Sequence, residues 1–201
     1  MDYNGSAIIA MVGKGCIGIA ADRRLGQNLT TIDTNFTKIF NLQPRVMVGF
    51  SGLATDVQTV RNTLEYRLKL YELREERNMS PQTISFLLST MLYEKRFGPY
   101  YMEPVIAALD EDGKPFLSSM DLIGATMEAK DFVVAGNCTG NLLGMAESLW
   151  KPDLEPDQLF EVLAQALLSA VDRDALTGWG GVVHIVTMDG ITTRELKGRQ
   201  D

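Results

Sequence analysis

Residues 6–22 read SAIIAMVGKGCIGIAAD, two apolar runs separated by Gly-Lys-Gly. Two short runs rich in Ile, Val and Ala, joined by a glycine turn, are typical of a β-hairpin. Similar short runs follow at residues 29–33, 38–41 and 45–50. The first quarter of the chain is therefore predicted to be β-structure with tight connections.

Helical spacing of apolar residues then predicts helices in two successive pairs. The first pair covers residues 57–73 and a second helix that begins with Ser80 as N-cap and Pro81 at the first helical position. The second pair covers residues 139–149 and 156–171.

Strand character returns between and after the helix pairs. The predicted segments are residues 104–109, 116–120, 122–125, 132–135, 181–187 and 191–196. Because neighbouring strands mostly join by tight hairpins, a parallel doubly wound sheet is excluded. We predict an α+β fold, a four-layer alpha-beta-beta-alpha sandwich of two antiparallel sheets flanked by helix pairs, with residues 1–201 in a single domain.

Composition excludes several classes of function. With 19 basic and 26 acidic residues the formal net charge is −7, so nucleic acid is not an expected partner. Apolar runs are far shorter than the roughly 20 residues that span a bilayer, and the first residues lack a signal sequence, so an intracellular protein without membrane contact is expected. Cys16 and Cys138 suit neither a zinc site nor a disulfide framework, and we expect both to be reduced packing residues.

Four separated stretches resemble those of proteasome beta subunits, in that family's order and spacing. They are GSAIIA at residues 5–10, IAADRR at 19–24, GFSGLATD at 49–56 and RDALTG at 173–178. Together with Lys38 on a short predicted strand, they extend over nearly the whole chain. The resemblance implies the same four-layer sandwich and membership of the N-terminal nucleophile hydrolase superfamily.

Four other stretches are similar to those of one eukaryotic subunit type within this family. They are LREER at residues 73–77, YEKRFGPY at 93–100, DLIG at 121–124 and the final RQD at 199–201. The resemblance implies a beta ring of seven different subunits in the 20S core particle, stacked on an opposite beta ring and flanked by alpha rings. Such a particle degrades ubiquitinated proteins in the cytoplasm and nucleus. The helices at residues 56–77 and 80–93 are expected to contact neighbouring subunits.

The resemblance also places the positions of an active site. In active members a propeptide is removed before a threonine, whose hydroxyl attacks the substrate while its freed α-amine accepts the proton. An α-amine titrates near pH 7.7 to 8 and can serve as a base. Carried over to this chain, the nucleophile position is Ser6, the aspartate and lysine positions are Asp22 and Lys38, and Gly52 is the oxyanion-donor position.

Three observations favour a chain without catalytic residues, in which these positions are degenerate. Ser6 lacks the methyl group that restricts the rotamer of threonine. Asn137 stands where the family has a helper serine, although Thr177 keeps a hydroxyl at the other helper position. Residues 1–5 are expected to stay attached, which leaves an amide instead of an amine at Ser6. The alternative is an active serine or threonine-type peptidase subunit that uses Ser6 after removal of residues 1–5.

The same positions lead us to expect an ion pair and a cation site. Asp22 and Lys38 are expected to form a buried ion pair that steadies two strands. The resemblance also implies a possible Mg²⁺ at a subunit interface, held by the loop positions Val171, Asp174 and Thr177 and by the C-terminal carboxylate of Asp201 from the opposite ring. Oxygen ligands of this kind suit a hard cation, and no other cofactor is expected.

Overall fold

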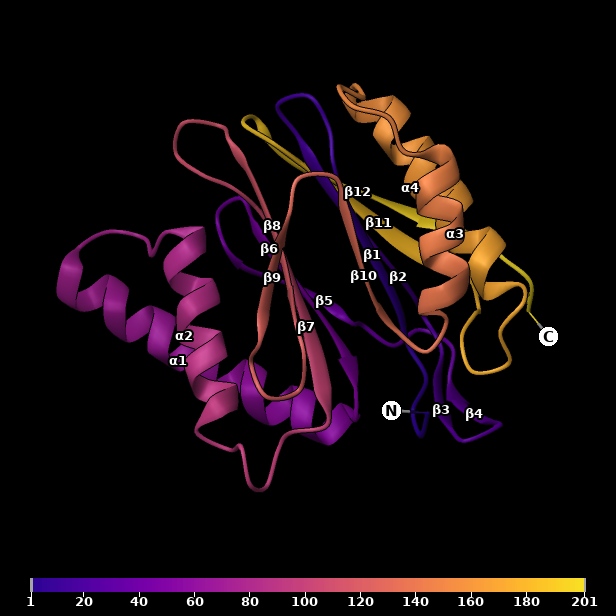
Figure 1. The fold of residues 1–201 in the computed structure, drawn as a ribbon, viewed down its shortest axis with the longest axis horizontal. Coiled ribbons are helices and arrows are strands. Elements are labelled where there is room, and N and C mark those ends of the chain that lie inside the picture. The colour runs from indigo at the N-terminus through magenta and orange to yellow at the C-terminus, as the bar shows by residue number, and fades with distance from the viewer. Residues whose placement is uncertain (1, 201) are drawn as a thin grey trace.

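The computed structural model describes residues 2–200, which form four layers in the order helices, sheet, sheet, helices (Figure 1). The two sheets have five antiparallel strands each, in the orders β10-β1-β2-β11-β12 and β5-β6-β7-β8-β9. The predicted sandwich is therefore confirmed. None of the helices within residues 2–200 has the length and apolar character needed to cross a membrane.

The first sheet is built around the hairpin of β1 and β2. Its strands are β1 (Ala7–Val12), β2 (Ile17–Asp22), β10 (Phe132–Gly136), β11 (Gly181–Thr187) and β12 (Gly190–Leu196). Every residue of β2 is buried, because this central strand is covered by helices on one face and by the other sheet on the opposite face. Such strands are continuously apolar instead of alternating.

The second sheet includes the predicted segments at residues 38–41, 45–50, 104–109 and 116–120. Its strands are β5 (Ile39–Gln43), β6 (Val46–Gly52), β7 (Met102–Leu109), β8 (Pro115–Met120) and β9 (Thr126–Ala129). A separate two-stranded sheet is formed by β3 (Leu25–Gln27) and β4 (Thr30–Asp33), and the start of the chain lies beside it in Figure 1.

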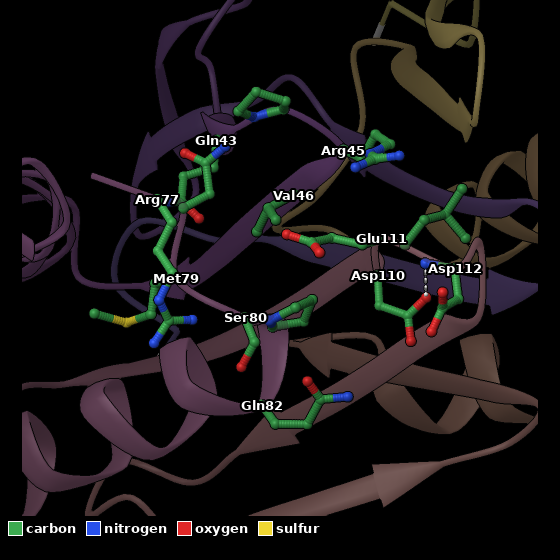
Figure 2. Close-up of a pocket in the computed structure, with 14 residues that line it drawn as sticks. Gln43, Arg45, Val46, Arg77, Met79, Ser80, Gln82, Asp110, Glu111 and Asp112 are labelled. Carbon is green, nitrogen blue, oxygen red and sulfur yellow. Dashed lines mark hydrogen bonds between the residues drawn. The ribbon is translucent and has the colours of Figure 1, made fainter. Parts of the chain in front are cut away.

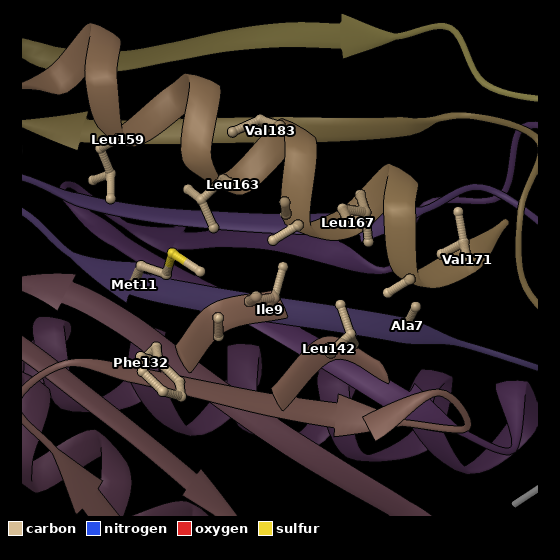
Figure 3. Close-up of a cluster of buried hydrophobic side chains, with 14 of the residues drawn as sticks. Ala7, Ile9, Met11, Phe132, Leu142, Leu159, Leu163, Leu167, Val171 and Val183 are labelled. Atoms are coloured by element: carbon tan, nitrogen blue, oxygen red, sulfur yellow. The ribbon is translucent and has the colours of Figure 1, made fainter. Parts of the chain in front are cut away.

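Helices α3 (Thr139–Leu149) and α4 (Pro156–Val171) cover the first sheet. Figure 3 shows Leu159, Leu163 and Leu167 of α4 directed toward Ile9 and Met11 of β1. All five side chains are fully buried, and each contributes about 1.5–3 kcal/mol of hydrophobic stabilisation. This layer fixes the position of β1 and hence of the residue that precedes it.

Helices α1 (Ala54–Glu75) and α2 (Pro81–Tyr93) cover the second sheet. As predicted, Ser80 caps α2: its Oγ accepts a hydrogen bond of 3.3 Å from the backbone N–H of Thr83, and Pro81 is the first helical residue. A third apolar cluster fills the space between the two sheets and includes Ile19 of β2 and Val105 of β7.

The outer surface of the α1–α2 layer carries exposed apolar side chains. Those of α1, α2 and the turn after α2 are Tyr66, Leu73, Phe86, Tyr93 and Phe97. On α3 and α4 only Leu143 is an exposed large apolar residue. The two outer layers of the sandwich therefore differ in how much apolar surface they leave uncovered.

The predicted strand at residues 122–125 is wrong. This segment is a turn in which Oδ1 of Asp121 accepts hydrogen bonds from the backbone N–H groups of Ile123 and Ala125, and Gly124 has a φ of +88°. An aspartate that bonds the backbone two residues on is typical of turns and competes with strand formation. The strand β9 begins only at Thr126, and the short strand β3 was not predicted.

Candidate functional site

The four predicted active-site positions meet at one end of the sandwich. Ser6 directly precedes β1, and Asp22 is the last residue of the paired strand β2. In the facing sheet, Gly52 is the last residue of β6, and Lys38 directly precedes β5, which pairs with β6. The site therefore lies where both hairpins end at the same side of the molecule.

Asp22 is the most constrained side chain of the site. Its Oδ1 lies 2.5 Å from Lys38 Nζ and also accepts the backbone N–H of Ala7 at 2.9 Å. Its Oδ2 accepts the backbone N–H groups of Gly178 at 3.1 Å and Arg24 at 3.3 Å. Four donors on a carboxylate whose side chain is 0% exposed fix its orientation and compensate for its burial.

Lys38 bridges Asp22 and the backbone ahead of Ser6. Its Nζ donates to Asp22 and, at 3.2 Å, to the carbonyl oxygen of Gly5. Burial of this ammonium, 3% exposed, lowers the pKa of Lys38, and the neighbouring Asp22 carboxylate opposes that effect. The predicted buried ion pair is present, and its cation is also bonded to the peptide group that links Gly5 to Ser6.

The nitrogen of Ser6 is a peptide amide in this chain, since Gly5 is bonded to it. It donates to Oδ1 of Asn137 at 3.0 Å, and the backbone N–H of Asn137 donates to the carbonyl oxygen of Ser6 at 2.8 Å. Nδ2 of Asn137 donates to the Asp2 carboxylate at 2.5 Å. An amide nitrogen has no basic lone pair, so in this connected form the proton acceptor of an N-terminal nucleophile is missing.

The hydroxyl groups of the site have their own partners. Oγ of Ser6 accepts a hydrogen bond of 3.3 Å from the backbone N–H of Gly52, the group predicted as oxyanion donor. Thr177 donates through Oγ1 to Oδ2 of Asp174 at 2.6 Å. The nearby thiol of Cys138 is buried, and burial raises its pKa to about 12, which makes it a poor nucleophile at neutral pH.

Two residues near the site were missed by the sequence analysis. Asn4 is 8% exposed and bonds to Gly26 and Ala54, and Arg24 is 3% exposed. The guanidinium of Arg24 donates to Thr31 Oγ1 and to the carbonyl oxygens of Asn28 and Leu176. The sequence could indicate only that Asn4, like other asparagines, tends to form hydrogen bonds with backbone groups. It could not indicate which backbone groups these are.

The loop predicted to hold a cation forms a small pocket. Val171, Asp174 and Thr177 line a cavity of about 150 Å³, and the carbonyl oxygen of Val171 accepts the backbone N–H of Asp174 at 3.1 Å. The fourth predicted ligand, Asp201, lies outside the described residues. Within residues 2–200, no three His, Cys, Asp or Glu side chains are grouped so that they could hold a metal ion.

Figure 2 shows a second polar pocket, of about 290 Å³. It is lined by Arg45, Arg77 and Glu111 among others. Val46 at its wall and Gly52 at the site are opposite ends of β6, about 20 Å apart at 3.3 Å per residue. This pocket takes no part in the chemistry around Ser6.

The fold and this arrangement define an α/β sandwich of the N-terminal nucleophile hydrolase class. The family model described as "Proteasome subunit" matches residues 2–186, and the chain belongs to that family. The chain is 58% identical over 200 residues to the proteasome subunit beta type-3 of Picea mariana, with 100% of this chain and 98% of the relative covered. Identity is 54% to the beta type-3 subunit of Drosophila melanogaster, over 99% of this chain and 98% of that one.

A third relative, from a fungus, is also a beta type-3 subunit. The chain is 48% identical over 201 residues to the probable proteasome subunit beta type-3 of Schizosaccharomyces pombe, with 100% and 98% of the two chains covered. The beta type-3 subunits are the subunit type that four stretches of the sequence resemble, namely residues 73–77, 93–100, 121–124 and 199–201. Within the family the chain is thus a beta type-3 subunit, a non-catalytic beta subunit of the 20S core particle.

Proposed function

We propose that this chain forms one wall segment of a seven-membered beta ring, with Ser6 retained as an internal residue, and that residues 1–201 act as one domain. The observation that carries the proposal is the peptide group between Gly5 and Ser6. Lys38 is bonded to its carbonyl oxygen and Asn137 to its N–H. Ser6, Asp22, Lys38 and Gly52 then serve as structural contacts at degenerate active-site positions.

The exposed surface of the α1–α2 layer supports contacts with other subunits. Large apolar patches on a single chain are typical of surfaces that assembly covers. The partners that we propose are neighbouring beta subunits, the opposite beta ring and the alpha rings, in a particle that degrades ubiquitinated proteins in the cytoplasm and nucleus. The formal charge of −7 supports the absence of nucleic acid from this list.

Mass measurements on the purified particle test this proposal. Native mass spectrometry should find the chain in the assembled core particle, and its intact mass should include residues ahead of Ser6. The variant Ser6→Ala should leave peptide hydrolysis by the particle unchanged, because an amide at this position supplies no base. A mature chain that begins at Ser6, together with hydrolysis lost in Ser6→Ala, would instead establish the active serine peptidase.

A Mg²⁺ ion at the 171–177 loop is the second part of the proposal. Carbonyl oxygens of Val171, Asp174 and Thr177, with the C-terminal carboxylate of Asp201 from the opposite ring, provide the oxygen ligands that Mg²⁺ prefers. The shared pocket of about 150 Å³ supports this arrangement.

Crystals of the particle grown with Mn²⁺ in place of Mg²⁺ should show an anomalous scattering peak at this loop. Manganese accepts similar oxygen ligands and scatters anomalously, so it reports the position directly. A map with no peak beside Val171 at millimolar Mn²⁺ would remove the cation from the proposal. The ring function would be unaffected by that result.

A further inference from the structure

The backbone of residues 3–4 lies along the free edge of β3. The backbone N–H of Gly26 donates to the carbonyl oxygen of Asn4 at 2.9 Å, and the backbone N–H of Asn28 donates to that of Tyr3 at 2.8 Å. The other edge of β3 pairs with β4. Residues 2–4 form a turn, and the carbonyl oxygens of Tyr3 and Asn4 cap the amides of Gly26 in β3 and of Asn28 directly after it. These edge amides are therefore occupied, as they would be by the carbonyl groups of an added strand.

The side chain of Asn4 fastens this segment at two further points. Its Nδ2 donates to the carbonyl oxygen of Gly26 at 2.9 Å, and its Oδ1 accepts the backbone N–H of Ala54 at 2.9 Å. Ala54 is the first residue of α1, and the N-cap residue Leu53 provides no side-chain hydrogen bond. Asn4 therefore supplies from a distant part of the chain the acceptor that a helix N-terminus ordinarily obtains from its own N-cap.

The end of the segment is closely fitted to the protein. Gly5 has a φ of +72°, and a Cβ at this position would overlap the carbonyl oxygen of Leu176. That carbonyl accepts a hydrogen bond of 2.8 Å from the buried guanidinium of Arg24. At the other end, Asp2 accepts the bond from Asn137. Residues 2–5 thus contact Asn137, the Gly26–Asn28 edge and the first residue of α1.

We propose that residues 2–5 are an internal peptide ligand of the β3 edge, anchored by Asn4, and that they close this edge to peptides in trans. The inference rests on the proposed function in one respect, namely that the segment stays attached. The ligand class that the edge would otherwise take is an extended peptide. An open β3 edge would leave the Gly26 and Asn28 amides available to unfolding substrates, and open edges are common sites of unwanted strand pairing.

Hydrogen exchange in the assembled particle tests the anchoring role of Asn4. In Asn4→Ala we expect exchange of the Ala54, Gly26 and Asn28 amides to rise about tenfold or more, because the cap is lost and the segment detaches more often. In Asn4→Asp a carboxylate still accepts the Ala54 amide, so that amide should stay protected. The matched control is Gln27→Ala, a change of an exposed side chain on β3 that should alter none of these rates.

A peptide probe tests closure of the edge. A photoreactive peptide with the sequence Asp-Tyr-Asn-Gly, added to intact particles, should crosslink to residues 26–28 of this chain at least about tenfold more in Asn4→Ala than in the wild type. Equal crosslinking in both, or unchanged exchange in Asn4→Ala, would overturn the inference. Intact mass separates the two proposals: a chain lacking residues 1–5 contradicts the proposed function, whereas a complete chain with unprotected amides contradicts only the internal ligand.

Discussion

Replacing Asp22 with alanine is expected to lower the free energy of unfolding by about 3–5 kcal/mol. The substitution leaves the ammonium of Lys38 buried without its counter-charge and removes the acceptor of three backbone N–H groups. The loss should be measured on the assembled particle by urea titration with pulse proteolysis, following the tryptic fragments of this chain. Incorporation of the variant into particles should fall in parallel.

A double variant separates the charge from the hydrogen bonds. Asp22→Ala with Lys38→Met removes both members of the ion pair, and methionine fills much of the space of the lysine stem. The double variant should be more stable than Asp22→Ala alone, since no unpaired charge stays buried. If Asp22→Ala cost less than 1 kcal/mol, the carboxylate would not be the organising residue of this end of the sandwich.

Replacing Gly5 with alanine is expected to cost about 2–4 kcal/mol, the second large effect. One part is the left-handed backbone at φ +72°, and the larger part is the overlap of the new Cβ with the Leu176 carbonyl. Because that obstacle is backbone, either the 172–180 loop or residues 2–5 must move. The measurement is again urea titration with pulse proteolysis on the particle.

Gly15 provides the matched control for Gly5. Its φ is +61°, and a Cβ there would meet no atom within 4 Å. The variant Gly15→Ala should therefore cost only about 1 kcal/mol, the backbone part alone. If both variants lowered the free energy of unfolding by the same amount, the close contact of Gly5 with Leu176 would not contribute to the cost of Gly5→Ala.

Periodicity and turn residues were sufficient to predict the layers of this fold. The bounds of α3 and α4 agree with the prediction because apolar residues at helical spacing coincide with clear ends, such as Pro156 at the first position of α4. The error at residues 122–125 arose from a short apolar run, Leu-Ile, inside a turn set by the Asp121 side chain. Runs of two apolar residues do not distinguish a strand from a turn.

Four positions of the site, Ser6, Asp22, Lys38 and Gly52, were predictable from the sequence. Asp22 and Lys38 were found because their residue types and family positions imply a pair, and the structure places them together. The contacts of Asn4 with Ala54, of Asn137 with Ser6 and of Arg24 with Leu176 link segments distant in sequence. Such contacts depend on how the two sheets stack, which no local pattern specifies.

The exposed aromatic residues of the α1–α2 layer have a consequence for chains that have no place in a particle. In an unassembled copy, Tyr66, Phe86, Tyr93 and Phe97 stay exposed to solvent. Exposed apolar side chains of this kind are the surfaces that chaperones and proteases act on. We therefore expect excess copies that find no neighbours to be removed more quickly than assembled ones.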